Sequence, residues 1–85
     1  MATFINKYII LAIYKQSIVN KYGRWTPERE YIFNEIYNNS IINISKTENL
    51  KYSRASYYNV LNELVKIGIC SKNGNLFELT KFEII

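Results

Sequence analysis

The sequence predicts a small α+β domain that is mainly α-helical and carries one β-hairpin near its carboxyl end. Its 85 residues, 48% of them hydrophobic, suit one globular domain over residues 1–85. Apolar residues recur at helical spacing between clear capping residues. Asn73-Gly74 stands between two strand-like runs, which is the strongest short-range hairpin signal.

An N-terminal helix is predicted within residues 3–22, with Gly23 as its cap. The side expected to cover the domain core carries seven residues: Phe4, Tyr8, Leu11, Ala12, Ile18, Val19 and Tyr22. The opposite side carries Ile10, Ile13 and Tyr14, and a helix that is apolar on two sides usually has two partners. We therefore expect these three residues to form a homodimer interface. Two alternatives remain: the helix only completes a monomer's core, or residues 8–14, rich in β-formers, are a strand.

The second helix has the better-marked start. Thr26 is a good N-cap, Pro27 suits the first helical position, and Glu28 and Glu30 favour the first turn. Residues 38–40 should end this helix, and residues 41–44 form a β-branched run that predicts a brief strand.

Two further helices and the hairpin complete the prediction. Ser45 and Glu48 have capping-box spacing, which predicts a short helix over residues 45–51. Ser53 is the N-cap of a longer helix over residues 53–67, which ends before Gly68. The hairpin spans residues 69–80, with Asn73 and Gly74 at two turn positions that both require positive φ.

Residues 44–80 resemble the winged helix-turn-helix family. The matching features are Leu50 and Tyr52 around the turn, the polar helix start Ser53-Arg54-Ala55-Ser56, the Leu61-x-x-Leu64-x-x-x-Gly68 pattern, and the wing closure Phe77-Glu78-Leu79-Thr80. The closure is similar to that of MarR-like and archaeal regulators, and in size and composition the chain is similar to small winged-helix proteins of crenarchaeal viruses and plasmids. Lys46 departs from the family, which usually has an apolar residue there. The resemblance implies a winged helix-turn-helix over residues 26–80, with an extra N-terminal helix and a transcriptional regulator's function.

Helix 53–67 is then the recognition helix. Its outward residues, predicted to read base edges in the major groove, are Arg54, Ala55, Ser56, Tyr58, Asn59 and Asn62. Arg suits guanine, Asn suits adenine and Ala can meet a thymine methyl. The residues predicted to contact the DNA backbone are Lys51, Ser53, Lys66, Lys72 and the wing-tip Asn73. The alternative is an ordinary solvated helix face, with the lysines serving solubility.

The charge distribution is compatible with this interpretation. Of a formal net charge of +4, residues 1–26 carry +4, residues 27–50 carry −2, residues 51–75 carry +3 and residues 76–85 carry −1. Two basic zones suggest a directed anion-binding surface, although a merely basic surface explains the totals equally well.

The composition argues against several other classes. With no His, no Asp and one Cys, the chain lacks the usual groups of nucleophilic and metal sites, so we expect no enzyme activity, no metal and no cofactor. The longest apolar run, from Tyr8 to Tyr14, is far below the roughly 20 residues needed to span a membrane. We expect a cytoplasmic protein, in the host cytoplasm if it is viral. No small-molecule effector is evident.

Two functions remain open. The leading hypothesis is a sequence-specific regulator that binds double-stranded DNA as a homodimer. The alternative is a winged-helix protein-interaction module in a replication or transcription assembly, which should show an apolar patch on the recognition face. An RNA-binding role has less support because no stacking-sheet motif is present.

Overall fold

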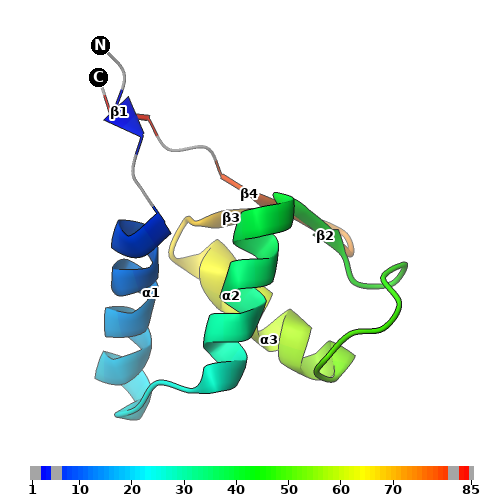
Figure 1. Cartoon of the computed structure of the whole chain (residues 1–85), viewed down its shortest axis with the longest axis horizontal. Helices are drawn as coiled ribbons and strands as arrows, with labels where there is room; N and C mark the ends of the chain where they lie inside the picture. Colours follow the sequence, from blue (N-terminus) through cyan, green and yellow to red (C-terminus); the bar gives the residue numbers. More distant parts are fainter. Residues whose placement is uncertain (1–2, 5–6, 81–82, 85) are drawn as a thin grey trace.

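The computed structural model describes residues 3–4, 7–80 and 83–84. Its elements follow in the order β1 (Thr3–Phe4), α1 (Lys7–Tyr22), α2 (Pro27–Asn39), β2 (Ile41–Asn43), α3 (Arg54–Lys66), β3 (Cys70–Asn73), β4 (Leu76–Leu79) and β5 (Glu83–Ile84). Within the described residues there are three helices, a three-stranded antiparallel sheet and a two-stranded pairing of β1 with β5 (Figure 1). The predicted α+β class with a hairpin is confirmed.

The three-stranded sheet has the order β2-β4-β3. The central strand β4 places Phe77 between Ile42 of β2 and Lys72 of β3 in antiparallel register. Phe77 is fully buried, and Ile42 is nearly so. The brief strand predicted at residues 41–44 is therefore confirmed as β2. By pairing with β4, it attaches the hairpin to the segment that connects α2 and α3.

The core lies where α2 and α3 cross beside this sheet (Figure 1). Helix α2 contributes Ile32, Phe33 and Ile36, all with no exposed surface. Helix α3 contributes Tyr57, Val60, Leu61 and Leu64, at the spacing of one helical face. Burial of such side chains contributes roughly 1.5–3 kcal/mol each, so this face fixes which side of α3 points outward.

Both helices start at their predicted caps. The backbone N–H of Arg29 donates to Thr26 Oγ1 at 3.4 Å, and Pro27 is the first helical residue. The backbone N–H of Ser56 donates to Ser53 Oγ at 3.1 Å. These side chains satisfy N–H groups that a helix start leaves without intrahelical partners.

Helix α1 differs from its prediction at its first residue. It begins at Lys7 rather than at residue 3, because Thr3–Phe4 pairs as a strand with Glu83–Ile84. The predicted core role of the Phe4 side chain lies outside the described residues. At the other end Gly23, with φ 82°, donates its N–H to the carbonyl of Val19, and the predicted cap is confirmed.

The buried face of α1 differs from the predicted one. Ile18 is buried, as predicted, but Tyr8 is 78% exposed and Val19 and Tyr22 are exposed too, whereas Ile10 and Tyr14 of the other side are buried. Ile10 and Tyr14 therefore belong to the core of the single chain, and the prediction that they form a dimer interface is wrong. The reason is Tyr14, whose ring stacks on Phe33 and meets Trp25 edge-on, with centroids 6.2 and 5.1 Å away.

The short helix predicted over residues 45–51 is not formed. Ser45 Oγ donates to Asn43 Oδ1 and Thr47 Oγ1 donates to the Asn43 carbonyl, so neither hydroxyl caps a helix. Asn49 has φ 59°, a left-handed conformation that interrupts any helix there. Residues 44–53 are a turn and a loop, which departs from the helix-turn-helix part of the predicted fold.

The hairpin forms as predicted, but its turn is shifted by one residue. Asn73 pairs with Leu76, so Gly74 and Asn75 are the two loop residues. Gly74 has φ 62°, and Asn75 is not among the residues with positive φ. A glycine at the first loop position is typical of a type II′ turn, so the predicted turn with two positive φ values is wrong.

Candidate nucleic-acid interface

The outward side of α3 carries a row of residues opposite its buried face. We define the outer ridge as Ala55, Asn59, Asn62 and Lys66, which follow one another at intervals of three and four residues. Ala55, Asn59 and Lys66 are exposed and Asn62 is half-buried. No hydrogen bond of the Asn59 side chain is seen among the described residues. The ridge therefore offers amide donors and acceptors, a methyl group and one cation to solvent.

Glu63, the one acidic residue of α3, lies on the flank of the helix, as its position in the sequence predicts. Arg29 donates to it through Nε and Nη2, both at 3.0 Å, and the Tyr14 hydroxyl donates to Oε1 at 2.6 Å. Burial, reinforced by this carboxylate, raises the pKa of the Tyr14 phenol well above its ordinary value, so Tyr14 remains a donor. The Glu63 carboxylate is thus neutralised, and it links all three helices.

Arg54 does not lie on the outer ridge. Its Nη1 donates to the carbonyl of Ile44 and, at 3.4 Å, to the carbonyl of Thr47. The residue predicted to read guanine instead holds the 44–47 turn against the start of α3. These partners are carbonyls of a loop that was predicted to be helical, so no sequence signal could have shown them.

Two other predicted readout residues also have partners within the chain. The Tyr58 hydroxyl donates to Asn75 Oδ1 at 2.6 Å, and its ring meets Phe77 edge-on. Ser56 accepts a hydrogen bond from the hydroxyl of the cap residue Ser53 at 3.0 Å. Of the six predicted readout residues, Ala55, Asn59 and Asn62 lie on the outer ridge.

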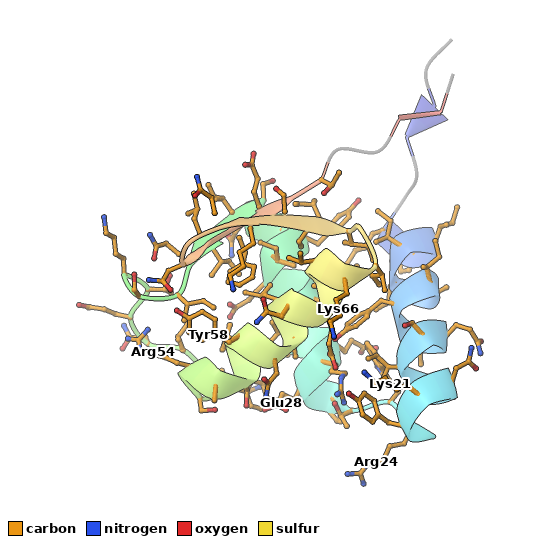
Figure 2. All side chains as sticks on the ribbon, turned by 180° about the vertical axis from the view of Figure 1, so that it is seen from behind. Lys21, Arg24, Glu28, Arg54, Tyr58 and Lys66 are labelled. Carbon is orange, nitrogen blue, oxygen red and sulfur yellow. The ribbon has the colours of Figure 1, made fainter. Side chains whose placement is uncertain are left out.

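The residues predicted to contact the DNA backbone surround the ridge unevenly. Lys66 is part of it, and Lys72 Nζ donates to Asn62 Oδ1 at 3.4 Å, which brings the hairpin beside α3. Asn73 is exposed at the end of β3. Lys51 lies apart, with its ammonium 4.5 Å from the centroid of the Tyr31 ring. Figure 2 shows Arg54 and Tyr58 towards one end of α3 and Lys66 towards the other.

A polar hollow of about 370 Å³ adjoins the outer ridge, between α3 and the end of α1. It brings Lys21, Tyr22 and Arg29 to Asn59, Asn62, Glu63 and Lys66. Neither Tyr22 nor Arg29 was predicted as a site residue, because the approach of α1 to α3 is a tertiary feature. The signal in the sequence was the positive charge of residues 1–26.

The predicted dimer residues are separated by the fold. Ile10 and Tyr14 are buried, and Ile13 is 52% exposed. The exposed large apolar residues of α1 are Tyr8, Ile9, Ile13, Val19 and Tyr22. This apolar surface lies on α1, and the ridge of α3 carries no large apolar side chain.

Within the described residues, no group of three or more His, Cys, Asp or Glu side chains could hold a metal ion. Cys70 is buried, which raises its pKa to about 12 and leaves it a protonated thiol. None of the described helices combines the length and the hydropathy required to cross a bilayer.

Comparison with known proteins shows no match to a protein-family model, to a curated protein or to a solved structure. The geometry of the α3 surface is therefore the basis on which a function can be proposed.

Proposed function

We propose that this chain is a non-catalytic DNA-binding protein that inserts α3 into the major groove of double-stranded DNA. A B-form major groove is about 12 Å wide and admits one α-helix. The outer ridge would face the base edges, and the β3–β4 hairpin would lie beside the sugar-phosphate backbone. The strand order β2-β4-β3 and the position of α3 before the hairpin suit this docking.

The observation that carries the proposal is the neutralised flank of α3. Its single carboxylate, on Glu63, is held by Arg29 and Tyr14, so the outward surface of the helix has no uncompensated negative charge. Lys66 and Lys72 add positive charge at its edge. A solvated helix face without a nucleic-acid ligand would more often carry mixed Glu and Lys.

Sequence preference is expected to come from Asn59 and Asn62. An asparagine amide can bind adenine through its N6 and N7 positions, and Ala55 can contact a thymine methyl. This is the chemistry of a transcriptional regulator's recognition helix. Because Arg54 and Tyr58 have partners within the chain, we assign them to holding the surface in shape.

We also propose that the protein binds DNA as a homodimer through the exposed side of α1, which includes Ile13 but neither Ile10 nor Tyr14. Ile9, Ile13 and Tyr8 are exposed there, away from the outer ridge. A second copy of the same face would cover them and would present two α3 helices to one duplex, as two-fold DNA-binding dimers do.

The same exposed side of α1 favours a second candidate function, a protein-interaction module. That module would use α1 and not the recognition face, so its partner would take the place of a second copy of the chain on α1 without covering α3. The two functions differ in what they require of α3: only DNA binding depends on the outer ridge.

The experiment that tests the proposed function is selection from random-sequence duplex DNA, followed by titration of the best site at several salt concentrations. The proposal predicts an enriched sequence and an affinity that falls linearly with salt on logarithmic axes. No enrichment and no salt-dependent binding would contradict it.

A further inference from the structure

The hollow between α1 and α3 is lined mainly by cationic and amide side chains. Lys21 and Tyr22 come from the last turn of α1, Arg29 from the first turns of α2, and Asn59, Asn62 and Lys66 from α3. Three separate elements therefore converge on one polar depression. In Figure 2, Lys21 and Lys66 lie on the same side of the molecule, near the end of α3 that is opposite Arg54.

The charges in the hollow leave a net positive surface. Glu63 also lines it, but its two carboxylate oxygens accept from both Arg29 nitrogens and from Tyr14. The negative charge of Glu63 and the positive charge of Arg29 therefore cancel. The ammonium groups of Lys21 and Lys66 have no carboxylate partner among the described residues.

The ring of Tyr22 keeps the cations of the hollow in place. Lys21 Nζ lies 5.3 Å and Arg29 Cζ lies 5.1 Å from its centroid. Cation–π contacts of this kind contribute about 0.5–1 kcal/mol at exposed sites. The lysine is thus held near the hollow without losing its charge to an ion pair.

We propose that this hollow binds a phosphate group of the DNA backbone, so that α1 is part of the DNA interface. The inference rests on the proposed function and extends its contact surface beyond α3 and the hairpin. Lys21 from α1 and Lys66 from α3 would donate to the phosphate oxygens, while the amides of Asn59 and Asn62 remain directed to the base edges. Phosphate oxygens accept such charge-assisted bonds well.

The occupant is a backbone phosphate and not a small phosphorylated ligand, because the hollow and the outer ridge share residues. Asn59, Asn62 and Lys66 belong to both. A duplex docked on the ridge would bring its flanking strand close to the hollow, because three residues of the ridge line it. The phosphate at this position would fix the register of the duplex without reading its sequence.

The test measures duplex affinity against salt for full-length variants. The double variant Lys21→Ala/Lys66→Ala should reduce the slope of log affinity against log salt by about 0.9, which is the slope that one neutralised phosphate contributes, and each single variant should reduce it by part of that amount. The reduction in affinity should be equal for selected and random duplexes. Lys21→Arg keeps the charge and should keep the slope.

Lys15→Ala is the matched control. It removes the same charge from the same helix, but Lys15 lies outside the hollow with its ammonium 5.9 Å from the Trp25 ring centroid. Its slope should equal that of the unmodified protein. Circular dichroism melting of every variant establishes that each is folded at the temperature of the titration.

The outcomes separate this inference from the proposed function. If the unmodified protein binds duplex DNA and Lys21→Ala behaves as Lys15→Ala does, the inference is wrong and the proposed function stands. If the unmodified protein binds no duplex, both fail. In a last experiment, inorganic phosphate is added to the protein while the side-chain amide signals of Asn59 and Asn62 are followed by NMR. Saturation at low millimolar phosphate without duplex binding would identify a small-anion site and overturn the inference.

Discussion

The Tyr58 hydroxyl on α3 donates a 2.6 Å hydrogen bond to Asn75 Oδ1 in the turn of the β3–β4 hairpin. Close by, Lys72 of the hairpin donates to Asn62 of α3 at 3.4 Å. Helix α3 and the hairpin are therefore joined by polar contacts on the surface as well as through the core. A duplex would meet them as one preformed unit, which lowers the ordering cost of binding.

The Tyr58→Phe variant tests this connection between α3 and the hairpin. The variant keeps the ring against Phe77 but removes the donor to Asn75. We expect a loss of stability of at most about 1 kcal/mol, because the bond is solvent-exposed. Faster amide hydrogen exchange in residues 73–76 and weaker binding to all duplexes alike should accompany it. If exchange in the hairpin is unchanged, the hydrogen bond does not hold the hairpin.

Asn59→Ala and Arg54→Ala should have different effects. Asn59→Ala should relax base preference at one position, at a cost of roughly 1–3 kcal/mol on the best site, with little change in melting temperature. Arg54→Ala should lower the unfolding free energy by about 1–2 kcal/mol, because it frees two backbone carbonyls of the 44–47 turn. Selected-site binding and denaturant unfolding measure both quantities.

Lys72→Ala is the control for this pair, since it should weaken binding to every sequence equally. If the Arg54→Ala variant loses base preference while keeping full stability, Arg54 reads a base directly. The assignment of Arg54 to the 44–47 turn would then be wrong.

Glu63→Gln should change stability and DNA affinity in opposite directions. The amide cannot neutralise Arg29, so the network that links the three helices is weakened by about 2 kcal/mol. The freed positive charge of Arg29 then adds to the hollow, and binding to random duplex should strengthen at low salt. Denaturant unfolding and fluorescence anisotropy test the two effects. Weaker binding by a folded variant would contradict the assignment of this flank to the DNA interface.

Ile13→Glu tests the homodimer. Ile13 is 52% exposed, so the charge should leave the fold intact while it disrupts any contact through this side of α1. Sedimentation at micromolar concentration should show a dimer for the unmodified protein and a monomer for the variant. The control is Ser71→Glu, which adds the same charge at a polar exposed position of β3. A monomeric unmodified protein would refute the homodimer.

The features that could be predicted from the sequence are those that depend on local chemistry. Thr26 and Ser53 are caps because their hydroxyls accept from N–H groups three residues ahead, and both are confirmed. The buried face of α3 was predictable because its apolar residues occupy one side only. The buried face of α1 was not predictable, because apolar side chains lie on several sides of that helix. Tyr14 faces inward, where its hydroxyl donates to Glu63, a residue far away in the sequence.

Tertiary partners also explain what the sequence could not predict about the site. Asn59 and Asn62 were predictable as outward residues from periodicity alone. The roles of Arg54 and Tyr58 were not, because their partners are the 44–47 turn and the hairpin turn. The hollow was hidden for the same reason: Lys21, Arg29 and Lys66 approach one another only after α1 folds against α3.

Amide chemical-shift mapping shows directly whether the outer ridge of α3 contacts duplex DNA. The backbone and side-chain amide signals of a ¹⁵N-labelled sample are followed while its selected duplex is added. We expect the largest changes at Asn59, Asn62 and Lys66, smaller ones at Lys72 and Lys21, and none at Ile13 beyond those caused by dimerisation. Changes confined to the exposed side of α1, or no changes at all, would contradict a contact through the ridge.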